Sequence, residues 1–202
     1  MKVGIVGGTF NPVHVGHLVL GECAYEEAQL DEIWFMPNAI PPHKQITNKE
    51  VSTQDRANML QLAIQEQPYF QLNAYEIERA NHISYTYQTL EDFHVLYPEH
   101  SFYFIIGSDS LFAIESWKCP DKILQACTLL VACRENTDLD NLQKQIQYLN
   151  SKYACQIQLL QMPLLEISSS VIRKRVKQNK NIKYLVSNSV RKYIKCNQLY
   201  QK

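Results

Sequence analysis

Several features that mark large classes of proteins are missing from this sequence. Its 202 residues include 20 Lys+Arg and 20 Asp+Glu, so the formal net charge is +0 and the basic excess of a general nucleic-acid binder is absent. No apolar run is long enough to span a membrane, and Met1-Lys2 lead straight into a strand-like segment with no signal peptide visible. We therefore expect a cytoplasmic protein without a membrane or nucleic-acid partner.

Cysteine pairs with the spacing of redox or metal motifs are also missing. The chain has 6 cysteines, none of them in a C-x-x-C arrangement, and several lie in apolar, strand-like runs. We expect them to be small buried hydrophobic side chains in a reducing compartment. No metal site formed by protein ligands is predicted.

The two commonest phosphate-binding loops are absent as well, since the chain has neither G-x-G-x-x-G nor G-x-x-x-x-G-K-[ST]. In their place a short apolar run, 3–6, is followed by Gly7-Gly8-Thr9-Phe10-Asn11-Pro12-Val13-His14-Val15-Gly16-His17 and then by a helix-like stretch. Glycines let a backbone approach a ligand closely, and a helix N-terminus offers free N–H groups and a positive dipole end. His14 and His17 share one face of the first turn. The segment predicts a phosphate site, against the alternative of two ordinary surface or capping histidines.

Strand-like and helix-like segments alternate along the whole chain. The apolar runs are near-continuous, as in a parallel sheet covered on both faces, so we expect an α/β fold with a doubly wound parallel sheet and C-terminal helices. We expect a single domain, 1–202, in which 167–202 is a helical subregion. The expected strands are 2–6, 32–36, 70–77, 101–106, 128–133 and 157–162, and the expected helices are 15–30, one capped by Ser52 or Thr53, 84–96, 141–149, 168–177 and 187–194.

A second candidate phosphate site lies at the start of a late helix. Ser168, Ser169 and Ser170 open this helix, and Arg173 follows one turn later. Hydroxyls, free N–H groups and a guanidinium all suit phosphate oxygens, although a serine N-cap followed by a surface arginine would look the same. Half of the basic residues also lie beyond this point, either on a solvated helix face or as an attraction for a polyphosphate: Arg173, Lys174, Arg175, Lys177, Lys180, Lys183, Arg191, Lys192, Lys195 and Lys202.

These motifs together resemble the bacterial nicotinate-nucleotide adenylyltransferases, within the HxGH nucleotidyltransferases that share a fold with class I aminoacyl-tRNA synthetases. The family pattern G-G-T-F-D-P-x-H-x-G-H corresponds to 7–17, and I-S-x-T-x-I-R corresponds to 167–173. Three residues depart from the pattern, because Asn11 stands where Asp is usual, Ser170 where Thr is common and Lys118 where Tyr is usual. Further matches are Pro37-Asn38, Pro41-Pro42-His43-Lys44, Ser84-Tyr85-Thr86, Ile105 to Asp109, Trp117 and Leu199-Tyr200.

The resemblance implies adenylyl transfer from ATP to nicotinate mononucleotide, with Mg²⁺ carried on ATP. It implies catalytic roles for His14, His17, Lys44 and Arg173. The residues implied in ATP binding are Gly8, Thr9, Phe10, His14, Gly16, His17, Gly107, Asp109, Arg134, Ser168, Ser169, Ser170 and Arg173. Those implied in mononucleotide binding are Asn38, His43, Lys44, Tyr85, Thr86, Trp117 and Lys118.

Several alternatives stay open at the level of sequence. Trp117 stacks on a pyridinium ring or lies in the core, and Asp109 binds a ribose or caps a helix. The acceptor could also be nicotinamide mononucleotide, phosphopantetheine or glycerol phosphate. A different class of function, a non-catalytic nucleotide-binding or RNA-binding protein, is a further alternative. The sequence also leaves open whether the chain forms a homodimer.

Overall fold

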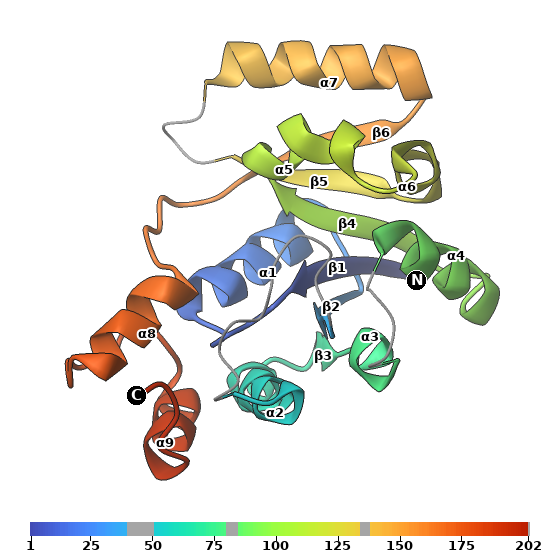
Figure 1. Ribbon diagram of the computed structural model, residues 1–202. Coiled ribbons are helices and arrows are strands. Elements are labelled where there is room, and N and C mark those ends of the chain that lie inside the picture. Colours follow the sequence, from blue (N-terminus) through green and yellow to red (C-terminus); the bar gives the residue numbers. More distant parts are fainter. Residues whose placement is uncertain (40–50, 80–84, 134–137, 202) are drawn as a thin grey trace. The chain divides into compact units, whose positions relative to one another are not determined.

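The computed structural model describes residues 1–39, 51–79, 85–133 and 138–201 (Figure 1). Six strands form one sheet in the order β3-β2-β1-β4-β5-β6. The pairs β1–β4, β4–β5 and β5–β6 are parallel, with Val6 opposite Ile105 and Gly107 opposite Ala132. The strands are β1 (Lys2–Gly8), β2 (Glu32–Pro37), β3 (Phe70–Leu72), β4 (Ser101–Gly107), β5 (Thr128–Cys133) and β6 (Gln156–Gln161).

The strand order confirms the doubly wound α/β fold. The order reverses between β1 and β4, and in such sheets ligands bind beyond the carboxyl ends of the strands at this point. Near-continuous burial along β1, β2, β4 and β5 fits a sheet covered on both faces, since Val3, Ile5, Leu129 and Val131 are all fully buried, whereas the edge strand β6 is mostly exposed. The apolar runs seen in the sequence are therefore the inner strands of the sheet.

All six expected helices are present, with shifts of a few residues at their ends. Of the two expected caps of α2, Ser52 or Thr53, the structure selects Ser52, which also forms a capping box with Asp55. Three short helices near 75–126 were not expected. The helices are α1 (Val15–Glu27), α2 (Thr53–Ile64), α3 (Tyr75–Glu78), α4 (Thr86–Leu96), α5 (Ser108–Ala113), the 3-10 turn η1 (Ile114–Ser116), α6 (Pro120–Ala126), α7 (Leu139–Tyr153), α8 (Ser169–Lys177) and α9 (Asn188–Cys196).

Two expectations were wrong. The strand expected over 70–77 stops at Leu72, because the Asn73 side chain accepts a hydrogen bond from the Tyr75 N–H (3.0 Å) and starts the helical turn α3. The cysteines are all free thiols, but Cys133 alone among them is buried and Cys196 is exposed.

The chain divides into two compact units. The first unit comprises Met1–Val6, Leu20–Ile33 and Ser84–Leu164, and the second comprises Gly7–Val19, Trp34–Ile83 and Leu165–Lys202. The expectation of a single domain stays a prediction. Among the described residues, no helix is both long and apolar enough to cross a membrane.

Candidate functional site

The two histidines of the opening motif stack on one another in the second unit. Their ring centroids lie 3.7 Å apart with planes inclined by 28°. His14 precedes α1 and is 7% exposed, while His17 lies in the first turn and is partly exposed. The alternative of ordinary surface histidines is therefore wrong for His14. The alternative of a capping histidine applies to His17, because its Nδ1 accepts from the N–H of His14, the residue before α1.

One hydrogen bond determines which nitrogen of His17 carries its proton. The His14 backbone N–H donates to Nδ1 of His17 at 3.2 Å. A nitrogen that accepts carries no proton, so the neutral ring must be protonated at Nε2. His17 thus offers a single N–H donor in a defined direction.

Both imidazoles are held in the neutral form. Burial lowers the pKa of His14 from 6.5 to about 4. Burial, and secondly the charge of His14, lower the pKa of His17 to about 3. At neutral pH the pair therefore presents N–H donors rather than positive charges to an incoming anion.

Gly16 lies where the ring of His14 passes close to the backbone. A Cβ atom at this position would be 3.1 Å from Nδ1 of His14 and 3.2 Å from its Cε1, so only glycine leaves the ring in place. On the other side, Phe10 meets His17 edge to face with centroids 5.0 Å apart. Both imidazoles are thus oriented by packing as well as by hydrogen bonding.

The loop of residues 9–14, between β1 and α1, has its carbonyl oxygens bound by side chains from distant parts of the sequence. Arg56 donates from Nη1 to the Thr9 carbonyl (2.6 Å), Arg173 donates from Nη1 to the Asn11 carbonyl (2.7 Å), and Ser169 donates from Oγ to the Pro12 carbonyl (2.7 Å). A trans peptide directs its N–H opposite to its C=O. Fixing the Thr9 carbonyl therefore also fixes the direction of the Phe10 N–H. The Asn11–Pro12 bond is cis.

Sequence reasoning missed Arg56, which is 1% exposed. Its Nη2 donates to the Asn38 carbonyl at 2.8 Å and to Oγ1 of Thr53 at 3.4 Å, and no carboxylate within the described ranges pairs with it. Burial lowers its pKa. The signal was present, because Arg56 falls on the apolar face of α2 one turn before Leu60, where a charge is unexpected.

Two buried polar atoms of this unit have no hydrogen-bond partner among the described residues. They are Nδ1 of His14 and Oδ1 of Asn38. Asn38 is also tied to the loop region, because its N–H donates to the Gly8 carbonyl (3.0 Å). Such atoms are uncommon in folded proteins, and a bound ligand or water is the usual explanation.

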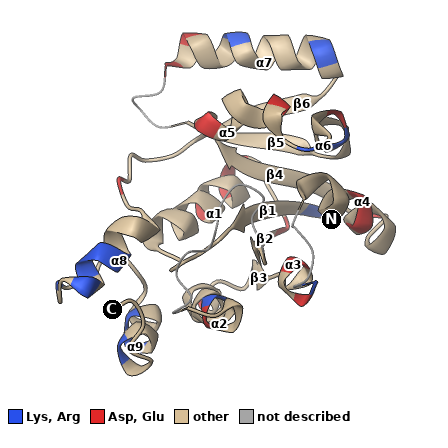
Figure 2. Cartoon of the chain, viewed as in Figure 1, with Lys and Arg blue, Asp and Glu red and all other residues tan. Residues whose placement is uncertain are grey.

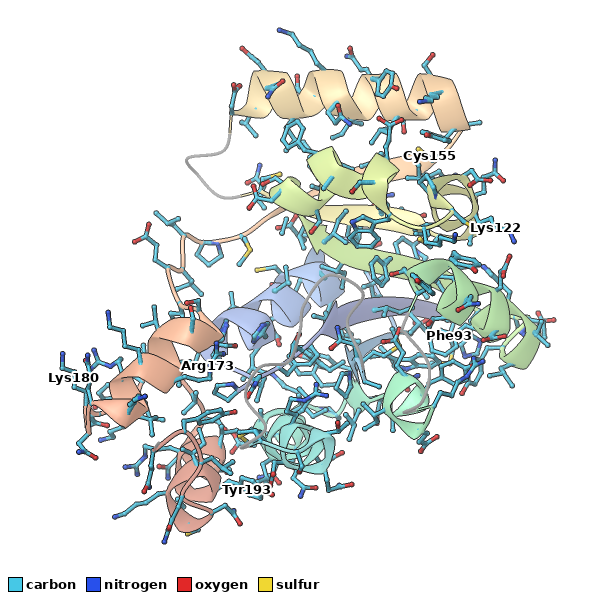
Figure 3. All side chains as sticks on the ribbon, viewed as in Figure 1. Phe93, Lys122, Cys155, Arg173, Lys180 and Tyr193 are labelled. Carbon is cyan, nitrogen blue, oxygen red and sulfur yellow. The ribbon has the colours of Figure 1, made fainter. Side chains whose placement is uncertain are left out.

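The start of α8 agrees with only part of what the sequence predicts for it. Ser168 is the N-cap, with its side chain accepting from the Val171 N–H, and Ser170 is exposed. The N-cap alternative is thus confirmed for Ser168, but the surface alternative fails for Arg173, because its Nη1 donates to the Asn11 carbonyl. Arg173 is labelled on α8 in Figure 3. The basic residues of α8 and α9 are unaccompanied by acidic residues (Figure 2).

The other predicted residues that the structure describes lie in the first unit. Tyr85 is the N-cap residue of α4 and Thr86 its first residue, so the expected helix start is confirmed. Gly107 takes the N-cap position of α5 and Asp109 lies exposed in its first turn, so the N-cap alternative for Asp109 is wrong.

Trp117 also belongs to the first unit and follows η1. It is partly exposed, and its ring lies edge to face with that of Phe104 at 6.3 Å. This is not the environment of a fully buried core tryptophan. The adjacent Lys118 is exposed.

Three predicted residues, His43, Lys44 and Arg134, lie outside the described residues. Their roles stay predictions. No group of three or more His, Cys, Asp or Glu side chains able to hold a metal ion occurs among the residues that are described.

Comparison with known proteins places this geometry in a family. A cytidylyltransferase-like family model matches residues 5–175. A probable nicotinate-nucleotide adenylyltransferase of Caldicellulosiruptor bescii is 42% identical over 100% of both chains, and one of Lachnoclostridium phytofermentans is 40% identical over 96% of both.

Solved structures support the fold. Nicotinic acid mononucleotide adenylyltransferase of Plasmodium falciparum, complexed with APC, has a TM-score of 0.78 at 23% identity, covering 98% of this chain and 96% of its own. The same protein complexed with NaAD has a TM-score of 0.77 at 23% identity, covering 98% and 97%. With the His-x-Gly-His geometry and the full-length relatives, these findings show that the chain belongs to the cytidylyltransferase-like nucleotidyltransferases and, within them, to the nicotinate-nucleotide adenylyltransferase family.

Proposed function

We propose that this enzyme transfers the adenylyl group of ATP to the phosphate of nicotinate mononucleotide, giving deamido-NAD and pyrophosphate. The observation that carries the proposal is the stacked, neutral histidine pair at the start of α1, with one ring nitrogen of His17 reserved as a donor. The names of the full-length relatives support the same reaction.

The chemistry needs no strong base and no covalent intermediate. An oxygen of the acceptor phosphate, already ionised at neutral pH, attacks the α-phosphorus of ATP. The bond from that phosphorus to the bridging oxygen breaks, and its electron pair leaves with pyrophosphate. What remains for the protein is to align two anions and stabilise the charge that develops on the phosphate oxygens.

We assign the phosphate contacts to residues of the second unit. His17 donates from Nε2 to an oxygen that gains charge, and His14 supports the stacked ring. The Thr9 carbonyl is turned to Arg56, so the Phe10 N–H is directed the opposite way. Gly8, Gly16, Ser168, Ser169, Ser170 and Arg173 complete the proposed set, with Lys44 and Arg134 as predicted further cations.

Mg²⁺ is proposed to arrive on the triphosphate, held by phosphate oxygens and water. The donor set fits this role, since the described residues of the second unit offer N–H groups, hydroxyls and cations to the phosphates rather than a cluster of carboxylates for the ion. The ion would add charge neutralisation at the transferred group.

Residues of the first unit are assigned to the acceptor and the ribose. We propose that Trp117 stacks on the pyridinium ring and that the N–H groups at the start of α4, around Tyr85 and Thr86, bind the carboxylate. The partly exposed ring and the helix start both suit these roles. Gly107 and Asp109 are assigned to the ATP ribose, and Lys118 to the mononucleotide. Two residues from outside this unit are also assigned to the mononucleotide, Asn38 of the second unit and the predicted residue His43.

A pyrophosphate-release assay with ATP and each candidate acceptor tests the proposal. We expect kcat/KM to be about a hundredfold higher for nicotinate than for nicotinamide mononucleotide, because oriented N–H donors gain more from a carboxylate than from a neutral amide. Equal or reversed values would refute the nicotinate assignment. No release with either acceptor or with phosphopantetheine would refute adenylyl transfer itself.

A matched pair of variants tests the pyridine platform. Trp117→Ala should raise KM for the mononucleotide and leave KM for ATP nearly unchanged. Phe112→Ala, which removes an aromatic ring 43% exposed on α5, should change neither. If both variants behave alike, Trp117 does not bind the acceptor.

A further inference from the structure

Tyr200, two residues before the last in the chain, is buried against the opening motif. It is 3% exposed, and its hydroxyl donates to Oδ1 of Asn11 at 2.6 Å. These two residues are separated by 189 positions in the sequence. The C-terminal segment is thus hydrogen-bonded directly to the 9–14 loop within the second unit.

The backbone near Tyr200 indicates that this placement is specific. Tyr200 has φ 65° and Gln198 has φ 52°, a left-handed conformation that bulky side chains rarely adopt. Leu199 is also buried, at 6% exposed. The burial of these two side chains and the hydrogen bond to Asn11 therefore compensate for an unfavourable backbone conformation in this segment.

Asn11 is the point where two supports of the loop meet. Its side chain accepts from Tyr200, while its backbone carbonyl accepts from Arg173. The charges of Arg173 and Arg56 both act on the Tyr200 hydroxyl, although burial is the larger effect and raises its pKa, so the phenol keeps its proton. Tyr200 is therefore a permanent donor at the centre of the groups that hold the loop.

We propose that Tyr200 is a positioning residue, which holds the 9–14 loop through Asn11 so that His14, His17 and Arg173 are correctly placed for phosphate chemistry. The inference rests on the proposed adenylyl transfer. The contact requires only an acceptor oxygen on the side chain at position 11, which the amide of Asn11 supplies.

The test compares two tyrosines that each lose one hydroxyl. Tyr200→Phe should lower kcat about tenfold, as expected for the loss of one buried hydrogen bond, while KM for ATP changes less than about threefold. Tyr193→Phe is the control, because the Tyr193 hydroxyl donates to Oδ1 of Asp55 (2.9 Å) and accepts from Nδ2 of Asn58 (3.0 Å), both on α2 and neither of them a residue of the 9–14 loop. This change should leave kcat unchanged; Tyr193 is labelled on α9 in Figure 3. A kcat of Tyr200→Phe within twofold of the control would overturn the proposal.

Variants of the partner residue separate positioning from general stability. Asn11→Ala should lose as much kcat as Tyr200→Phe, and the double variant should lose no more than either single change. Asn11→Asp keeps an acceptor for the phenol and replaces one neutral hydrogen bond by a charged one. Its kcat should therefore stay within about threefold of that of the parent enzyme. Losses that multiply in the double variant would show that the two residues act separately and would overturn the proposal.

A measurement without turnover distinguishes failure of this inference from failure of the proposed reaction. The ¹⁵N shifts of the His17 ring report the bond from the His14 N–H to Nδ1. We expect Tyr200→Phe to shift the Nδ1 resonance and Tyr193→Phe to leave it in place. An unchanged resonance in Tyr200→Phe would overturn the positioning role whatever acceptor the enzyme uses.

Discussion

Replacing Arg56 with methionine tests the buried support of the 9–14 loop most directly. Methionine fills a similar space but removes the guanidinium, which is 1% exposed and donates to the Thr9 and Asn38 carbonyls at 2.6 and 2.8 Å. The change leaves two part-buried carbonyl oxygens without these donors. It also removes a buried cation that no carboxylate within the described ranges neutralises.

The loss of these two hydrogen bonds destabilises the fold, whereas the removal of the buried charge stabilises it. The destabilising effect is the larger. Each unsatisfied carbonyl costs about 1–3 kcal/mol, and removal of a buried charge returns part of its desolvation energy. We expect a net loss of about 3 kcal/mol in the free energy of unfolding. For a chain of this size, that lowers Tm by about 6–12 °C.

Arg175 provides a matched control. Its Nε and Nη2 donate to the Asn181 carbonyl at 3.0 and 2.8 Å, but this interaction is exposed. Arg175→Met should therefore change the unfolding free energy by less than about 1 kcal/mol. Thermal and denaturant unfolding of the parent protein, Arg56→Met and Arg175→Met measure these losses. Equal losses of unfolding free energy in the two variants would refute the reasoning. Arg56→Lys should be intermediate, because a single ammonium cannot reproduce the forked contact with both carbonyls.

Three further predictions concern the histidine pair. His17→Ala should lower kcat by about a hundredfold with little change in ATP affinity, and near-normal turnover would remove His17 from the mechanism. Gly16→Ala should lower kcat because its Cβ displaces the His14 ring, yet leave Tm equal or higher because alanine favours a helix; a fall in Tm with normal kcat would contradict this. The pKa of His14 is lowered to about 4 by burial, so the unfolded chain binds protons that the folded chain does not. Stability should then be fully present above pH 6.5 and fall by on the order of 3 kcal/mol towards pH 4, and a flat acid titration of unfolding free energy between pH 6.5 and 4.5 would contradict the buried, neutral ring.

The sequence by itself determined the family, the strand–helix alternation and the identity of the opening motif. Near-continuous apolar runs identify inner strands of a parallel sheet, because both faces must be apolar. The motif of two glycines followed by His14 and His17 is local, so its spacing is visible without a structure. The cap of α2 could be narrowed to Ser52 or Thr53 for the same reason, since capping depends on residues within one turn, and the structure selects Ser52.

Only the tertiary structure decided what holds this motif in place. Arg56, Arg173 and Tyr200 reach the 9–14 loop from 47, 162 and 189 residues away in the sequence, and no periodicity records such contacts. Local rules also failed at 70–77, where one Asn73 side chain outweighed the strand preference of its neighbours. The neutral state of His14 and His17 has the same origin, because desolvation depends on which side chains fold over the rings and not on the residues beside them in the chain.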